Sequence, residues 1–380
     1  MQNAPIVVYS HLRWSSLMQR PQHLFSRISS SRRVLFLEET VQADPHVRDS
    51  IELRYPLPDL IVARPILAGA ADAFDAARLG PIARRLLRWQ DFATHVAWLY
   101  TPAALELAQA MSPELVVYDC MDEQSALESE LLERAHLVFS AGPSLYRAKR
   151  SLHPRVRCFP NSVDASHFQP REPLPEPPDE SALARPRLGF FGVLDERLDR
   201  ALLDAVAEAR PDWQIVLVGP VARIDPRSLP VRPNLHYLGP RSYESLPSYL
   251  AGWDVCLLPF ARSRATRCIS PTQTLEYMAA AKPIVTTPIR DVVEPYGRWV
   301  EVAQDADAFV AACERLLAEE PHARAERVRG MLACVAHTSW DDTAREMLHE
   351  LRDAEALSRV SASHALRQDE GLTHAASSGS

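Results

Sequence analysis

The residues best suited to chemistry lie in a polar segment that follows Cys268 and precedes an apolar run ending at Thr287. Ser270 is a good N-cap, Pro271 suits the first helical position, and Gln273 completes a Ser-x-x-Gln capping box. We therefore expect a helix to begin at about Pro271. The unpaired backbone N–H groups of its first turn, which includes Thr272, can bind a diphosphate at the carboxyl edge of a parallel sheet.

Glu276 lies one turn further along the same expected helix. A carboxylate at this position can accept hydrogen bonds from two ribose hydroxyls, so the segment favours binding of a nucleoside diphosphate. We assign Gly192 and Gly239, which end two apolar runs, to the same donor site. The alternative is a well-capped helix with an exposed glutamate, because capping boxes are common.

A diphosphate also needs positive charge, and arginines in two loops can supply it. Arg197 is our candidate, because its planar guanidinium can hold two phosphate oxygens at once. Its alternative is a solvated arginine in a turn rich in Asp and Glu. Arg262, Arg264 and Arg267 precede the expected helix and are rival candidates, of which we include Arg267 in the donor site.

Polar side chains follow apolar runs in the first half of the chain as well. Asp122 comes after the run 115–118, and we expect it either to orient an acceptor hydroxyl or stabilise positive charge at an anomeric carbon, or to cap the next helix. We assign His11, Trp14 and Arg20, which follow the run 6–9, to acceptor binding. For His23 we expect helix capping rather than chemistry.

The elements that must position these residues alternate along the chain, with short β-branched or aromatic runs between longer helical stretches. This pattern predicts an α/β fold of two Rossmann-like domains whose parallel sheets face a central cleft. The expected strands are 6–9, 34–37, 60–63, 96–100, 115–118 and 137–140 in the first half, and 188–192, 215–219, 235–239, 255–259, 284–287 and 299–302 in the second.

Proline and acid content mark the boundaries between these domains. We expect an acceptor domain at 1–165, a proline-rich linker at 166–186 and a nucleotide-sugar domain at 187–337. A helix at 338–354 would cross back to the first domain. From 355 to 380 the chain is rich in Ser, Ala and His, and we expect a disordered tail.

Three stretches resemble the retaining "group one" glycosyltransferases of the GT-B fold. Residues 277–285 are similar to the family's Ala-x-Gly-x-Pro-Val-Val, with Ala281 in place of the glycine. Residues 159–168 are similar to Pro-Asn-Gly-Val-Asp-x-x-x-Phe, and 246–259 resemble the penultimate helix and strand. Arg-Pro-Gln-His at 20–23 resembles a bacterial subgroup linked to cell-surface polysaccharide assembly.

This resemblance implies sugar transfer, with Glu276 on the donor ribose and Arg197 in place of the usual Arg and Lys that grip the diphosphate. The family's acidic residue eight positions before the glutamate falls on Cys268. The reaction implied is metal-independent and retaining, uses a nucleotide diphosphate sugar as donor substrate and needs no cofactor. Asp119 and Asp122 do not form an Asp-x-Asp motif, and no neighbouring His or carboxylate set completes a metal site.

Composition restricts the partners. The net charge of -7 provides no basic field for nucleic acid, so we expect none to bind. Six scattered cysteines without a CxxC pattern fit a reducing, cytoplasmic compartment, and we expect no leader segment before the first apolar run. We expect a saccharide or lipid-linked acceptor. The stretch Arg84-Arg85-Leu-Leu-Arg88-Trp89 is either a basic amphipathic helix on anionic lipid, which would give peripheral membrane contact, or a solvated helix face.

Two alternatives to a transferase remain open. A nucleotide-sugar epimerase on the same fold would consume donor without an acceptor. A non-catalytic scaffold protein would bind donor without turnover, as the missing Lys and the replacements at Cys268 and Ala281 allow.

Overall fold

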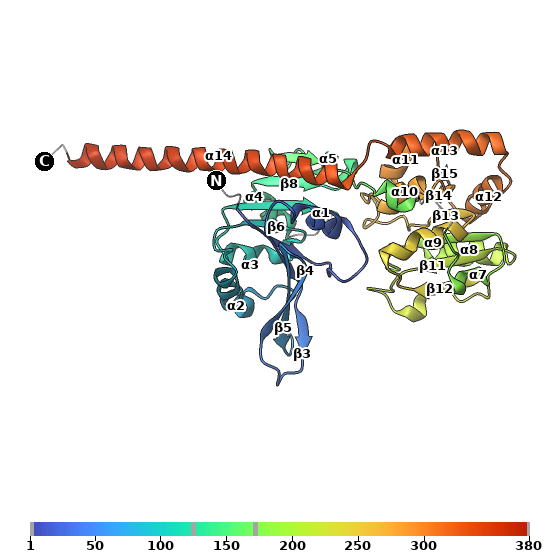
Figure 1. Cartoon of the computed structure of the whole chain (residues 1–380), viewed down its shortest axis with the longest axis horizontal. Helices are drawn as coiled ribbons and strands as arrows, with labels where there is room; N and C mark the ends of the chain where they lie inside the picture. Colours follow the sequence, from blue (N-terminus) through green and yellow to red (C-terminus); the bar gives the residue numbers. More distant parts are fainter. Residues whose placement is uncertain (1–3, 123–126, 170–173, 378–380) are drawn as a thin grey trace.

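Two sheets, each covered by helices on both faces, make up the computed structural model of the chain (Figure 1). The structure describes residues 4–122, 127–169 and 174–377, with side chains inside the last helix described as far as residue 360. Among these residues, no helix combines the length and the apolar composition that crossing a bilayer requires.

The first sheet has the strand order β3-β5-β2-β1-β6-β7-β8-β9, and β4 pairs with β5. All neighbours are parallel except β4 and β5, and β1 pairs with both β2 and β6, with Val8 opposite Phe36 and Trp98. Its strands are β1 (Ile6–Ser10), β2 (Val34–Glu38), β3 (Val41–Ala43), β4 (Ser50–Leu57), β5 (Leu60–Ala68), β6 (Val96–Leu99), β7 (Leu115–Cys120), β8 (Leu137–Ser140) and β9 (Val156–Cys158).

The second sheet is wholly parallel, in the order β12-β11-β10-β13-β14-β15. This is the doubly wound order, whose direction reverses between β10 and β13 and leaves a crevice at the carboxyl ends of those strands. Its strands are β10 (Arg187–Phe191), β11 (Gln214–Val218), β12 (Leu235–Gly239), β13 (Val255–Leu258), β14 (Ile284–Thr286) and β15 (Glu301–Val302).

The helices cover both faces of each sheet. Around the first sheet are α1 (Arg20–Ile28), α2 (Ala76–Trp89), η1 (Pro102–Ala104), α3 (Leu105–Ala110), α4 (Glu128–Arg134) and α5 (Pro143–Lys149). After β9 come α6 (Ala165–Phe168), α7 (Pro178–Ser181), α8 (Arg200–Ala209), η2 (Pro226–Ser228), η3 (Tyr243–Ser245), α9 (Leu246–Gly252), α10 (Thr272–Ala279), α11 (Arg290–Tyr296), α12 (Ala306–Leu317), α13 (Pro321–Val335) and α14 (Trp340–Ser377).

Alternate residues along the strands of the first sheet pack into two separate hydrophobic cores. Val7 and Tyr9 of β1 belong to one cluster, whereas Ile6 and Val8 belong to the cluster that α1 and α14 cover. The α/β fold with two parallel sheets is thus confirmed, and every expected strand is present. The strands β3, β4 and β9 were not expected.

The end of the chain differs from the expectation of a disordered tail. α14 crosses back from the second domain, packs on α1 and continues as one helix to Ser377, beyond the body of the first domain (Figure 1). The sequence from 355 to 377 contains no proline and only one glycine, Gly371, among many good helix formers. This composition favours a helix over a disordered chain. The expected linker also contains the short helices α6 and α7.

The end of α10 explains a departure from the family pattern. Ala281, which replaces the glycine, adopts a left-handed backbone with φ of 56°, and its N–H donates to the carbonyl of Met278 at 3.0 Å. Glycine adopts this conformation readily, whereas the Cβ atom of an L-residue makes it energetically unfavourable.

Ala281→Gly is therefore expected to stabilise the second domain. Glycine removes the steric cost of the left-handed conformation but gives the unfolded chain more conformational freedom. The expected net gain in the free energy of unfolding is about 0.5 kcal/mol. Urea unfolding measures the gain, with Ala280→Gly as the matched control. Ala280 has φ of -74°, so its replacement should destabilise. Equal destabilisation by both substitutions would contradict the interpretation.

Candidate functional site

A cleft between the two domains brings together residues that follow strands of both sheets. Asp122 of the first domain lines it after β7, and Gly192, Arg197 and Glu276 line it from the second domain. Ser270, Thr272 and Gln273 line it as well. Pro271, Gly239, Arg267, His11 and Trp14 are not among its lining residues.

The start of α10 differs from the expected capping box. The helix begins at Thr272, Pro271 is its N-cap, and no side chain caps it. Gln273 instead donates through Nε2 to the carbonyl of Phe191 at 3.2 Å, and the Ser270 carbonyl accepts from Asn161 Nδ2 at 2.6 Å. The capping prediction was wrong because the helix begins one residue later than expected, so that Ser270 precedes the N-cap, and because the Gln273 side chain has a tertiary partner. The first N–H groups of α10 still lack intrahelical acceptors and lie beside the cleft.

Glu276 is the most unusual group in the cleft. Its side chain is on the inner face of α10, the residue is 4% exposed, and its carboxyl has no hydrogen-bond partner among the described residues. Burial, followed by the nearby charge of Asp164, raises its pKa to about 8. With this pKa Glu276 is mainly protonated at neutral pH, and ligand hydroxyls that donate to its carboxylate would displace the proton.

Tyr243 is a cleft residue that the sequence reasoning missed. Its ring stacks on His167 with centroids 4.2 Å apart and meets the edge of His23 at 5.2 Å, so its position is fixed. The hydroxyl is buried without a partner in the described part of the chain, and burial and then Glu276 raise its pKa. Tyr243 follows β12, so the rule that polar residues after parallel strands face the ligand would have found it.

The turn after β10 requires glycine. Gly192 has φ of 148°, and a Cβ there would lie 2.7 Å from Gln273 Nε2. Gly219 is just as constrained, because its Cβ would lie 1.8 Å from the Gly192 carbonyl oxygen. These close approaches join the ends of β10 and β11 to the start of α10, which shapes this wall of the cleft.

Arg197 holds its place through Asp195, a buried carboxylate with 2% exposure. Nε and Nη2 of Arg197 donate to the two carboxylate oxygens at 3.0 and 2.7 Å, which leaves Nη1 for a ligand. The rival arginines Arg262, Arg264 and Arg267 are exposed and outside the cleft lining. The geometry thus favours Arg197 and does not bring Arg267 to the site.

Arg241 lines the cleft together with Arg20 and Arg197, and the sequence did not predict it. Its Nη2 pairs with Asp179 at 2.6 Å and its Nε donates to Tyr249 at 2.6 Å. No pattern around residue 241 distinguishes it, because its position depends on the fold of the linker helix α7.

His11 does not line the cleft but interacts electrostatically with charged residues of both domains. Burial lowers its pKa to about 4, Asp122 opposes that shift, and Arg223 and Arg197 add to it. His11 is therefore neutral at pH 7, and its Nδ1 has no partner among the described residues. Asp122, His11 and Arg197 thus gather where the two domains meet.

Arg20 lines the cleft, but its guanidinium is bound within the protein, and Trp14 is outside the cleft lining. Arg20 is fully buried, with Nε 3.1 Å from both Asp119 oxygens and Nη1 donating to the carbonyl of Phe159 at 2.8 Å. Trp14 packs on the edge of Phe36 with centroids 5.2 Å apart. Trp14 is therefore not placed to contact an acceptor, whereas Arg20 borders the cleft with its guanidinium paired to Asp119.

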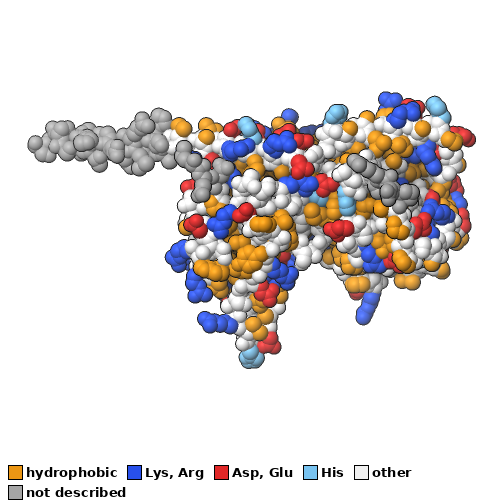
Figure 2. Space-filling model, in the orientation of Figure 1, with side chains coloured by type: hydrophobic (Ala, Val, Ile, Leu, Met, Phe, Trp, Pro, Cys, Tyr) orange, Lys and Arg blue, Asp and Glu red, His pale blue; other side chains and the backbone are white. Residues whose placement is uncertain are grey.

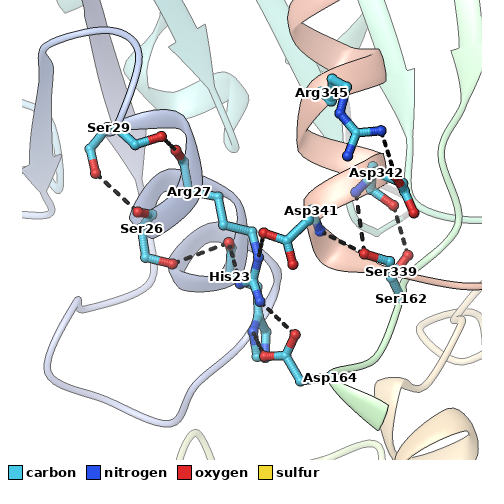
Figure 3. A network of polar contacts seen from close by, with 12 residues as sticks. His23, Ser26, Arg27, Ser29, Ser162, Asp164, Ser339, Asp341, Asp342 and Arg345 are labelled. Carbon is cyan, nitrogen blue, oxygen red and sulfur yellow. Dashed lines mark hydrogen bonds and ion pairs between the residues drawn. The ribbon is translucent and has the colours of Figure 1, made fainter. Parts of the chain in front are cut away.

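The crossing between the domains carries a polar network (Figure 3). Arg27 of α1 pairs with Asp164 at 2.5 Å and with Asp341 of α14 at 3.1 Å. His23 stacks on Trp340 with centroids 4.8 Å apart, and burial lowers its pKa to about 3. His23 is inside α1, whose N-cap is Gln19, so the expected capping role was wrong. Because Asp164 also acts on Glu276, the network connects the crossing to the cleft.

Two observations bear on metal and sugar binding. Over the residues that the structure describes, no group of three or more His, Cys, Asp or Glu side chains is placed to hold a metal ion. Cys268, at the position of the resembled family's acidic residue, is buried against the core of the first domain.

Sequence comparison finds a match between the second domain and the model of a known family. Residues 185–319 match the model of the glycosyl transferases group 1. The chain is also 25% identical over 285 residues to a protein of Bacillus subtilis (strain 168) that is assigned to teichuronic acid biosynthesis as a glycosyltransferase. That alignment covers 66% of this chain and 70% of the relative.

Comparison with solved structures shows the fold. A sucrose-phosphate synthase from Thermosynechococcus elongatus has a TM-score of 0.70 at 16% identity, covering 93% of this chain and 100% of that one. The HepE protein of Anabaena, solved with UDP and glucose, has a TM-score of 0.65 at 15% identity, covering 92% and 100%. The architecture of two Rossmann-like domains about a cleft is that of GT-B glycosyltransferases.

Proposed function

We propose that this chain, which is a glycosyltransferase, takes its sugar from a nucleoside diphosphate donor bound between its two domains. The observation that carries the proposal is Glu276, a buried carboxyl without a partner in the described structure, one turn into a helix whose first N–H groups line the same cleft. The structure of the Anabaena relative with UDP and glucose supports this donor class.

Each polar group at the cleft has a proposed role in binding the donor or the acceptor. Glu276 and Tyr243 would hold the ribose, and the first N–H groups of α10 with Nη1 of Arg197 would stabilise negative charge on the departing diphosphate. Asp122 and neutral His11 would orient the acceptor hydroxyl or stabilise the anomeric carbon. Closure of the domains would exclude water, which competes with the acceptor.

Five finer features are part of the proposal. Transfer retains the anomeric configuration, needs no metal ion and uses no cofactor besides the donor substrate. The acceptor is a saccharide, free or lipid-linked, in cell-surface polysaccharide assembly, which the relative from Bacillus subtilis supports. The enzyme works in the cytoplasm, at the inner face of the membrane when the acceptor is lipid-linked.

Turnover assays separate this function from its alternatives. Purified protein is incubated with UDP-, GDP-, ADP- and TDP-sugars, with and without a bacterial membrane fraction as acceptor, and sugar incorporation and nucleotide release are measured. Incorporation from one donor, with release of its nucleoside diphosphate, is the expected result. Conversion of the donor sugar without acceptor would indicate an epimerase, and binding without turnover would indicate a scaffold protein.

The affinity for the nucleoside diphosphate is expected to rise with pH up to about 8, the pKa of Glu276. Ribose hydroxyls that donate to the carboxylate stabilise its charged form, so binding below that pH must release the proton. The affinity should then increase by at most about tenfold per pH unit.

Calorimetric titrations at pH 7 in two buffers of different ionisation enthalpy measure the protons released. Glu276→Gln should remove the release, because the amide does not titrate. Proton uptake, or release that persists in Glu276→Gln, would contradict the assignment.

Tyr243→Phe is expected to weaken nucleotide binding about fivefold, the effect of one lost hydrogen bond. The ring stays clamped by His167 and His23, so only the hydroxyl is removed. Binding titrations measure the change, and Tyr55→Phe, which alters an exposed tyrosine, is the control. Equal affinities of Tyr243→Phe and wild type would assign the hydroxyl no role.

A further inference from the structure

A groove with an apolar floor and a cationic rim lies on the first domain, between α2 and β4. Ile51 and Leu53 of β4 and Leu86 of α2 form its floor and pack partly against the core. Arg48 and Arg85 line it as well, and both side chains are exposed. The groove is distinct from the cleft, since the two share no lining residue.

The charge of this groove is positive although the chain carries -7. Arg48, Arg85 and Arg88 are exposed, and none forms an ion pair within the described residues. Asp49 is the one acidic lining residue, and Arg78 already neutralises it at 2.6 Å. Figure 2 shows basic side chains beside hydrophobic ones over this part of the first domain.

Trp89 ends α2 at the rim of the groove and is 71% exposed. The remaining tryptophans are buried or half-buried. A large aromatic ring in water beside arginines is costly for a soluble surface but suits the boundary between lipid headgroups and acyl chains. Its position follows from the helix: Leu79, Ala83 and Leu87 face the core, so Arg85, Arg88 and Trp89 face outward.

We propose that this groove and the outer face of α2 dock on a bilayer surface that contains anionic phospholipid. The arginines bind the lipid phosphates, and Trp89 inserts at the headgroup level over the apolar floor. The charge complementarity favours lipid, because a purely polyanionic partner would leave the apolar floor unused. The proposal goes beyond sugar transfer and does not depend on the donor site.

Vesicle binding tests the proposal on the full chain. Vesicles of phosphatidylcholine mixed with phosphatidylglycerol should sediment the protein, and vesicles of phosphatidylcholine alone should not. The tryptophan emission should shift to the blue with the anionic vesicles, since Trp89 leaves water, and Trp89→Phe should remove that shift. Absence of binding to anionic vesicles at low salt would overturn the proposal.

Charge reversal locates the surface. Arg85→Glu with Arg88→Glu should lower the affinity for anionic vesicles more than tenfold, since each basic residue near such a surface contributes about 1 kcal/mol. The matched control, Arg329→Glu with Arg352→Glu, has the same net charge and changes exposed arginines on α13 and α14. Equal losses in both double variants would overturn the assignment to this groove.

Two further readouts separate loss of the surface from loss of the fold and from self-association. Thermal unfolding of the Arg85→Glu, Arg88→Glu variant should match wild type, so that lost binding reflects the surface and not the fold. Self-association without vesicles that disappears in Trp89→Ser would assign the groove to a second copy of the chain and overturn the lipid proposal.

Discussion

Glu276→Ala is expected to weaken nucleoside diphosphate binding by roughly tenfold to a hundredfold, because a carboxylate that accepts two hydroxyls contributes about 1.5 to 3 kcal/mol. The carboxyl lies inside the cleft and has no described protein partner, so its removal breaks no contact of the folded protein. Calorimetric titration at pH 8.5, where the wild-type carboxyl is largely ionised, measures the difference in dissociation constant.

The control for this substitution is Glu244→Ala, which removes an exposed carboxylate next to Tyr243. Its affinity should equal that of wild type. Thermal unfolding should show that Glu276→Ala is folded and no less stable, since the change removes a buried ionisable group. An unchanged dissociation constant in Glu276→Ala would contradict the assignment of Glu276 to the donor ribose.

Arg197→Ala is expected to lower kcat by about 10² to 10³, with a smaller effect on nucleotide affinity, because charge on the diphosphate is greatest as the sugar departs. Asp195 would also lose its partner, so the alanine variant is expected to be less stable. Single-turnover kinetics at saturating donor measure the step directly.

Arg197→Lys and Arg267→Ala complete the test. Lysine keeps the charge beside Asp195 but lacks the planar fork, so it should recover stability and only part of the rate. Arg267→Ala should leave kcat unchanged, since that side chain is outside the cleft lining. A larger loss of rate in Arg267→Ala than in Arg197→Ala would reverse the choice between the two arginines.

Local patterns predicted the sheets and the position of α10 because their signals lie within short segments. Strands buried on both faces, such as β7 and β13, are apolar throughout, which no exposed segment imitates. The strand β4 was not predicted from the sequence, because it pairs antiparallel at the edge of the sheet and is largely exposed. Its residues therefore include the charged Glu52 and Arg54.

Individual side-chain roles required the tertiary structure. The local pattern around Ser270 and Gln273 is that of a capping box, but Asn161 and Phe191, distant in sequence, supply their partners. We assigned Arg20 to the ligand because polar residues after a strand often face it. Its guanidinium is instead hydrogen-bonded to Asp119 of β7. Contacts between distant segments leave no spacing signal in one sequence.

The most direct test of the account is a thermal-shift panel of UDP, GDP, ADP, TDP and CMP, with and without EDTA, on wild type and Glu276→Ala. A ligand that binds the folded state raises its melting temperature with occupancy. The account predicts a rise with one nucleoside diphosphate that EDTA leaves unchanged and Glu276→Ala removes. No rise with any nucleotide would contradict a donor site in this cleft.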